Sequence, residues 1–222
     1  MQPPMHSTPS ALFPLLILLM TFLEAGAGEY KAYPAYSVKS PRGSFVIGQR
    51  ARVEEDGWFW QAWICPETAS APSYQLPLWH EGELSWCGNF YISPDERFIL
   101  HIQKTGSAAN DGAVFTRGRD GRFALSRSGD PGLSLSRGAW SFFGRSTGLK
   151  SASFRTGLGF VAWGTDGECL ELSLRGQDFG GDHFVQDWRL HYHLVSQRFF
   201  LTRDQVRHNR RAITVAPFSP SS

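Results

Sequence analysis

Three histidines carry the clearest metal-ligating pattern in this sequence. His191 and His193 alternate within residues 188–195, so on a β-strand both project to one side and could reach one ion. His183 or Asp187 would supply a third ligand. The same alternation places the histidines on the polar face of an amphipathic strand, where solvent exposure explains them without an ion. We expect no metal, with a site at the three histidines as the alternative.

One serine matches the pattern of a hydrolase nucleophile. Gly144-Arg145-Ser146-Thr147-Gly148 fits G-x-S-x-G, which requires a helix directly after the serine. The residues that follow, 149–157, are Ser-rich and end in Gly, which favours a strand or a loop. The sequence contains 23 glycines, so roughly 0.2 matches are expected by chance, and a single match carries little weight. We therefore predict no catalytic residue, and a hydrolase that uses Ser146 is the alternative.

The chain is rich in tryptophan, with eight in all. Trp60, Trp63, Trp79 and Trp86 are candidate ligand-binding residues, because exposed ring faces stack on sugars and peptides. Alternation along a strand places Trp63 on the face opposite Trp58 and Trp60, so at least one of these rings is expected at the surface. The other interpretation is a Trp-rich core.

Three cysteines limit the redox and metal chemistry. Of Cys65, Cys87 and Cys169, the first two enclose the shortest loop, and we predict a Cys65–Cys87 disulfide in an oxidising compartment. The alternative is three buried thiols. The sequence has no C-x-x-C, phosphate-binding loop, dinucleotide-binding glycine pattern, H-E-x-x-H or EF-hand loop, so no cofactor is expected.

The first residues have the pattern of a secretory signal peptide. Residues 11–23 are almost purely apolar, and Ala25-Gly26-Ala27 follows as an A-x-A cleavage pattern. A membrane-spanning helix needs about 20 apolar residues, and this run is shorter and contains Pro14. We predict a signal peptide at 1–27, a single domain at 28–222 and a periplasmic or extracellular location. No transmembrane segment is expected after cleavage; an uncleaved anchor is the alternative.

The small net charge argues against a nucleic-acid partner. The formal net charge is +2, too small to indicate nucleic acid. Basic side chains gather in a short C-terminal tail: Arg198, Arg203, Arg207, His208, Arg210 and Arg211. This tail is expected to be a solvated face; contact with an anionic lipid surface is the other interpretation.

Strand patterns dominate the chain and predict an all-β fold. Alternating or continuous apolar runs bounded by turns lie at 58–65, 97–102, 113–116, 122–125, 168–174, 188–195 and 198–202. Sustained helical periodicity is nearly absent. A short helix is expected at 203–211 with Thr202 as its N-cap, and the Ser-, Gly- and Pro-rich segment 126–137 is expected to be a loop.

The sequence also contains weak internal repeats. Residues 40–47 and 93–100 align with an offset of 53, each a Ser-Pro turn that leads into a strand. A third, weaker copy begins at 164–167 and runs through residue 172. A period of about 50 residues suggests blades or arrayed antiparallel sheets.

One repeat resembles a known family. Ser93-Pro94-Asp95-Glu96-Arg97-Phe98-Ile99-Leu100 is similar to the Ser-Pro-Asp-Gly-Arg/Lys signature of bacterial WD-like β-propeller repeats, with Glu96 in place of glycine. The resemblance implies that the turn precedes an inner strand of a blade, and that the fold is a scaffold for binding or assembly. Three copies are fewer than the four to eight blades of a closed propeller. A partial propeller and a sandwich therefore both remain open.

These patterns lead to one expectation of function. The chain as a whole resembles exported bacterial β-proteins, and we expect an exported, non-catalytic binding or interaction protein. Its partner would be a glycan or an envelope protein. The alternatives are a carbohydrate-binding domain with a Trp-rich surface, and a hydrolase or metal-binding protein.

Overall fold

The computed structural model describes residues 29–55, 57–68, 71–77, 85–106, 109–126 and 134–215. The signal peptide predicted at 1–27, and Trp79, lie outside the described residues. Within the described part of the chain, no helix combines the length and the apolar character needed to cross a membrane.

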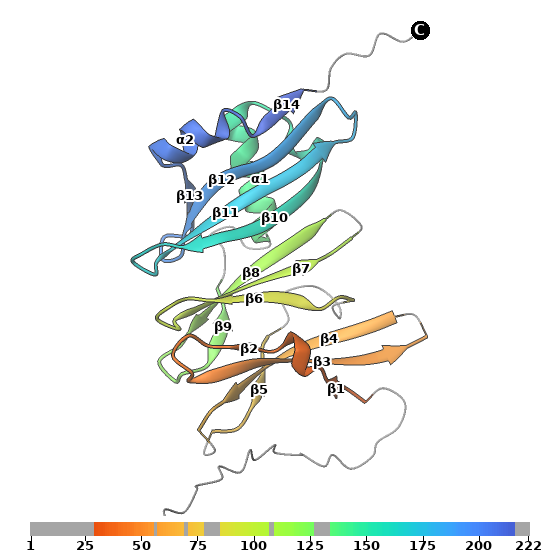
Figure 1. Ribbon diagram of the computed structural model, residues 1–222, viewed down its shortest axis with the longest axis vertical. Helices are drawn as coiled ribbons and strands as arrows, with labels where there is room; N and C mark the ends of the chain where they lie inside the picture. Colours follow the sequence, from red (N-terminus) through yellow and green to blue (C-terminus); the bar gives the residue numbers. More distant parts are fainter. Residues whose placement is uncertain are drawn as a thin grey trace, which may run out of the picture.

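The described residues form three antiparallel sheets, stacked in chain order (Figure 1). The first sheet contains β1 (Lys31–Ala32), β2 (Val38–Lys39), β3 (Phe45–Glu54), β4 (Gly57–Pro66) and β5 (Tyr74–Gln75). The second contains β6 (Gly88–Ile92), β7 (Phe98–Lys104), β8 (Asn110–Arg117) and β9 (Phe123–Leu125). The third contains β10 (Phe154–Trp163), β11 (Cys169–Asp178), β12 (His183–His193), β13 (Arg198–Phe200) and β14 (Ile213–Val215). The prediction of an all-β fold of antiparallel sheets is confirmed.

Two apolar cores hold the stack together, one on each face of the second sheet. Strand β7 is buried on both faces, because its side chains alternate between the two cores. Toward the first sheet lies a cluster that includes Phe45, Ile47, Ile64, Phe90, Ile99 and Phe115. Toward the third sheet lies a larger cluster that includes Leu100, Val114, Leu158, Leu172, Leu190 and Tyr192. Burial on both faces explains the nearly continuous apolar run of β7.

A helix that the sequence does not predict fills the larger core. Helix α1 (Leu135–Thr147) overlaps the segment expected to be a loop and extends past it. Its N-cap is Ser134, whose side chain accepts a hydrogen bond from the N–H of Arg137, and it ends at Gly148 in a left-handed conformation. It buries Trp140 among the aromatic side chains of the core. The expectation that helical structure is nearly absent before residue 203 is therefore wrong.

The short C-terminal helix is predicted correctly. Helix α2 (Arg203–Asn209) begins after Thr202, whose side chain accepts from the N–H of Gln205 while the Gln205 side chain accepts from the Thr202 N–H. This reciprocal pair is a capping box. The buried side chain of Asn209 hydrogen-bonds both the N–H and the carbonyl of Arg189, at 2.7 Å each, and so anchors α2 on β12. Two 3-10 turns complete the described elements, η1 (Pro34–Tyr36) and η2 (Ser151–Ser153).

The three predicted repeat turns have the same geometry. In each turn the N–H of the first residue donates to the carbonyl five residues later: Ser40 to Phe45, Ser93 to Phe98 and Gly164 to Cys169. The fourth residue is left-handed in each: Gly43, Glu96 and Gly167, with φ of 75°, 61° and 69°. Glutamate in this conformation is strained by about 1 kcal/mol, because its Cβ crowds the following carbonyl.

The buried carboxylate of Glu96 links the second turn to the first. It accepts a hydrogen bond from the N–H of Arg42, at 2.7 Å, and another from the Ser44 hydroxyl. Burial raises the pKa of Glu96, but hydrogen bonds from Ser44, Ser40 and the Arg42 backbone lower it more, so the net pKa lies below its ordinary value. The strained turn is therefore stabilised by contacts that a glycine could not make.

We expect Glu96→Ala to lower the free energy of unfolding by about 2 kcal/mol, because it leaves a backbone N–H and a hydroxyl without their acceptor and keeps the backbone strain. Glu96→Gly loses the same hydrogen bonds but relieves the strain, so it is expected to be about 1 kcal/mol less destabilising than alanine. Urea unfolding at pH 7 measures both. An alanine variant as stable as the parent would contradict the proposed link.

Candidate functional site on the first hairpin

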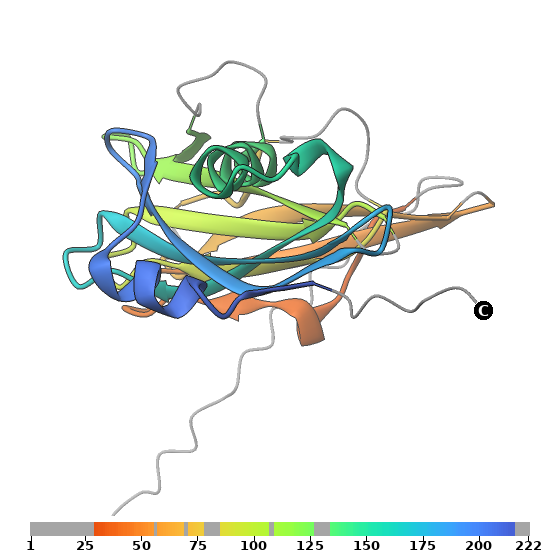
Figure 2. The same ribbon diagram turned by 90° about the horizontal axis from the view of Figure 1, so that it is seen from above.

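The β3–β4 hairpin projects past the second sheet (Figure 1, Figure 2). Strands β3 and β4 have ten residues each, whereas β6 and β7, which lie next in the stack, have five and seven. The face of the first sheet that packs on the second, called the inner face below, is therefore uncovered near the hairpin tip. There Val53 and Trp58 are 58% and 43% exposed.

Four aromatic side chains form a patch on this uncovered inner face: Tyr33, Tyr36, Trp58 and Trp60. The rings of Trp58 and Trp60 are nearly parallel, with centroids 5.9 Å apart and planes at 17°. The ring centroid of Tyr33 lies 5.1 Å from that of Trp60. The Tyr36 ring meets Trp60 edge-on, with centroids 5.4 Å apart. Trp60 is buried, but Trp58 and Tyr36 are nearly half exposed. The aromatic patch thus combines a packed base with an accessible surface.

A buried glutamine fixes this patch relative to the second sheet. The Gln49 side chain is 4% exposed and lies on the inner face of β3. Its Nε2 donates to the carbonyls of Tyr36 and Gly88, both at 2.9 Å, and its Oε1 accepts from the Gly88 N–H at 3.0 Å. One side chain therefore holds both the 3-10 turn that carries Tyr36 and the first residue of β6. Such a satisfied buried amide positions its neighbours rigidly.

Three of the four tryptophans predicted to bind a ligand lie among the described residues, and the structure places them apart. Trp60 lies under the aromatic patch. Trp63 is on the opposite face of the sheet, as its alternation with Trp60 predicts, where the Arg50 guanidinium covers its ring at 4.3 Å. Trp86 is 46% exposed and lies beside Lys104, whose ammonium group is 4.2 Å from the ring centroid. Trp79 lies outside the described residues.

The patch also contains residues that sequence reasoning does not select. Trp58 belongs to the same alternating strand as Trp60 and shares its face. Tyr33 and Tyr36 belong to the polar, Tyr-rich segment that precedes the first repeat, and that composition is their only signal in the sequence. Their role depends on η1 folding back against β3, where the Tyr33 N–H donates to the Gln49 carbonyl at 2.9 Å.

The predicted Cys65–Cys87 disulfide is absent from the structure, in which both thiols are free. Cys65 occupies the β4 face opposite to Trp60, whereas Cys87 packs beside Trp60. The sheet therefore separates the two sulfur atoms. The third thiol, Cys169, has a raised pKa because it is partly buried and lies near Asp166 and Glu168, which disfavours a reactive thiolate.

The three histidines of the alternative metal site are not brought together. His183 and His191 lie at opposite ends of β12, eight residues and roughly 26 Å apart. His183 contacts Asp178 at 3.0 Å, and His191 stacks on Phe200 with ring centroids 5.2 Å apart. His193 Nδ1 accepts from the N–H of Ser196 at 3.0 Å and so closes a turn. Among the described residues, no three His, Cys, Asp or Glu side chains are placed to hold an ion.

The serine of the G-x-S-x-G pattern does not form a nucleophile elbow. Ser146 lies in the last turn of α1, whereas the elbow requires a serine between a strand and the start of a helix. The 13-residue helix precedes this serine, and a short 3-10 turn follows it. The local backbone therefore does not support Ser146 as a nucleophile of this type.

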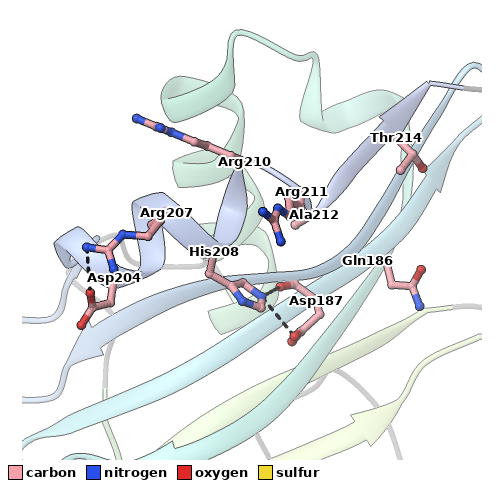
Figure 3. Close-up of a pocket in the computed structure, with 9 residues that line it drawn as sticks. All are labelled: Gln186, Asp187, Asp204, Arg207, His208, Arg210, Arg211, Ala212 and Thr214. Atoms are coloured by element: carbon pink, nitrogen blue, oxygen red, sulfur yellow. Dashed lines mark hydrogen bonds and ion pairs between the residues drawn. The ribbon is translucent and has the colours of Figure 1, made fainter.

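The basic C-terminal tail borders an open pocket of about 850 Å³ next to α2 (Figure 3). Asp187 lies there at a bulge, with φ of 56°, and its carboxylate contacts both Arg189 and His208 at 3.1 Å. Arg207 is paired with Asp204 at 3.6 Å. The acidic side chains offset part of the positive charge of the tail, which favours its interpretation as a solvated face with structural ion pairs.

Comparisons with known proteins add little. No protein-family model matches the sequence, and no curated protein matches it. Among solved structures, the chain is similar to one described as TolB from Agrobacterium tumefaciens, with 10% sequence identity and a TM-score of 0.30. The match covers 78% of this chain and 61% of that protein, so the chain spans less than two thirds of its length. A likeness of this size identifies neither a family nor a function.

Proposed function

We propose that this chain is an exported, non-catalytic binding protein that holds a carbohydrate against the aromatic patch. The observation that carries the proposal is the half-exposed indole of Trp58, stacked over the buried indole of Trp60 on a part of the hairpin that the second sheet leaves open. An exposed ring that is held by packing against Trp60 and Tyr33 offers apolar surface to a sugar ring and loses little side-chain entropy on binding.

The composition of the patch favours binding over catalysis. Its four side chains provide flat ring surfaces and hydroxyl groups. Cleavage of a glycosidic bond would instead require two carboxyl groups on either side of the bond. The signal-peptide pattern at residues 1–27 supports a location outside the cytoplasm, where such a binding protein would meet extracellular or envelope glycans.

We expect Trp58→Ala and Tyr36→Ala each to weaken carbohydrate binding by about tenfold, or about 1.4 kcal/mol, because Trp and Tyr are enriched among the contact residues that contribute most to binding. The probes are cellohexaose, chitohexaose and maltohexaose, titrated against the purified protein while tryptophan fluorescence is recorded. Phe184→Ala is the matched control, because Phe184 is 37% exposed but lies on the third sheet.

Binding of one hexasaccharide that Trp58→Ala weakens and Phe184→Ala leaves unchanged supports the proposal. Absence of binding by all three probes at millimolar concentration would overturn it. So would a Trp58→Ala variant that binds as tightly as the parent protein. Thermal unfolding of each variant shows whether the fold is retained.

A further inference from the structure

A second cavity lies between the second and third sheets and has a different chemical character. This inter-sheet cleft has a volume of about 560 Å³. Three basic side chains line it, from β7, β10 and β11: Lys104, Arg155 and Arg175. Three side-chain amides, those of Asn89, Asn110 and Gln177, line it as well. No acidic side chain is among its lining residues.

Among the described residues, no salt bridge offsets the positive charge of the cleft. Lys104, Arg155 and Arg175 form no salt bridge with any carboxylate of the described residues. The C-terminal pocket differs, since acidic side chains there contact its basic groups. Like charges gathered around one concave surface repel one another, and an anion between them relieves that repulsion.

The pairing of β10 with β11 places Arg155 and Arg175 on the same face of the third sheet. In the β10–β11 ladder Arg155 lies opposite Gln177, and Gly157 lies opposite Arg175, so these four residues share a face of the third sheet. A Cβ built at Gly157 would lie 2.8 Å from the Cγ of Arg175. Glycine at this position therefore lets the Arg175 side chain lie across β10.

The opposite wall of the cleft is also fixed in place. The Asn110 side chain bridges the second and third sheets, because its Nδ2 donates to the Leu158 carbonyl at 2.8 Å and its Oδ1 accepts from the Leu158 N–H. Lys104 extends over the exposed ring of Trp86. Cys87 lines the cleft and also packs beside Trp60, so the cleft lies next to the aromatic patch.

We propose that the inter-sheet cleft binds a ligand that carries two or more oxyanion groups, such as phosphate, sulfate or carboxylate. Two guanidinium groups and an ammonium group supply charge-assisted hydrogen bonds to these oxygens, and the side-chain amides supply further donors. This inference is independent of the carbohydrate proposal, since it depends on the charge of the cleft and not on the aromatic patch. A free polyphosphate and an acidic saccharide both present this chemistry.

Isothermal titration calorimetry of the purified protein in about 50 mM salt tests the inference. The probes are sodium pyrophosphate, a trisulfated disaccharide and its unsulfated parent. We expect one or both anionic probes to bind with micromolar to submillimolar affinity, and the unsulfated disaccharide to bind at least tenfold more weakly. Preference for pyrophosphate would identify a phosphate ligand. Preference for the sulfated disaccharide, weakened by Trp86→Ala, would identify an acidic saccharide.

The double variant Arg155→Gln/Arg175→Gln is expected to weaken anion binding at least tenfold. Its matched control is Arg207→Gln/Arg210→Gln, which removes the same charge from the C-terminal pocket and should change the affinity less than twofold. An Arg155→Lys/Arg175→Lys variant retains the charge and should recover part of the affinity, which separates charge from folding. Trp58→Ala should leave pyrophosphate binding unchanged, so this proposal and the carbohydrate proposal can fail separately.

Two outcomes would overturn the inference. One is the absence of binding by both anionic probes at millimolar concentration. The other is an equal loss of affinity in the cleft variant and in the C-terminal control, which would show that the anions respond to net charge alone.

Discussion

Replacing Gly88 with alanine is expected to lower the free energy of unfolding by about 3 kcal/mol, an unusually large effect for one added methyl group. A Cβ built at Gly88 would lie 1.7 Å from Nε2 of His101, far inside van der Waals contact. The His101 ring cannot simply move aside, because it is 3% exposed and lies flat on Phe90, with ring centroids 4.2 Å apart and planes at 9°. Either this ring or strand β6 must shift.

A double-mutant cycle tests the cause. His101→Ala removes the ring, so Gly88→Ala in that background should cost less than about 1 kcal/mol. Gly48→Ala is the matched control: Gly48 also lies in a strand, but a Cβ there would meet only the Cys65 sulfur at 3.8 Å, an ordinary contact. Urea unfolding measures each variant. Equal costs of Gly88→Ala in both backgrounds would show that the His101 ring is not the obstacle.

Three strands of the third sheet, β11, β12 and β13, could be predicted in part from sequence, because alternating or continuous apolar runs lie at residues 168–174, 188–195 and 198–202; β10 and β14 are not predicted. In β12 the buried residues Trp188, Leu190 and Tyr192 face the core as the pattern predicts, and Leu194, the first residue after the strand, joins the same core. The repeat turns could also be predicted, since a Ser-Pro or Gly-Thr start and a left-handed fourth position are local properties of the chain. Local pattern and tertiary environment agree at these places.

Helix α1 could not be predicted by periodicity alone, because glycine and serine lower its intrinsic helix propensity. Gly138 shows why tertiary packing outweighs the low helix propensity of this segment. A Cβ built there would lie 2.9 Å from the Phe199 ring, so the glycine that weakens the helix also lets it approach the third sheet closely. Ser134 and Gly148 are cap signals that the sequence does contain. These two cap residues alone do not predict the helix, because the residues between them lack a clear helical pattern.

Both candidate sites depend on how neighbouring sheets stack and on the lengths of their strands. Neither property could be predicted from the single sequence. Alternation correctly separates Trp60 from Trp63, but the exposure of Trp58 results from the unequal lengths of strands in neighbouring sheets. The cleft likewise combines residues about 50 to 70 positions apart, such as Lys104 and Arg175, through the stacking of two sheets. No local motif marks either arrangement.

His101 should also make the fold sensitive to mild acid. Burial lowers the pKa of His101 to about 3, well below the value near 6.5 of an exposed histidine. The unfolded chain therefore binds a proton at a pH where the folded chain does not, so stability is greatest above pH 6.5 and is lost as the pH falls toward 3. The slope is about 1.4 kcal/mol per pH unit, which gives about 2 kcal/mol between pH 7 and 5 and about 5 kcal/mol in full.

Urea unfolding at pH 7, 6, 5 and 4 measures this loss, and His101→Leu is the variant that isolates it. Removal of the titrating ring should flatten the dependence between pH 6.5 and 4.5, whatever its effect on stability at pH 7. Glu96 and Asp95 also have lowered pKa values, but their contribution is lost below the ordinary range of carboxyl groups, near pH 4. The interval above pH 4.5 therefore reports on histidine. If the variant and the parent protein lost stability equally over that interval, His101 would have to be charged in the folded state, in conflict with its packing against Phe90 between two sheets.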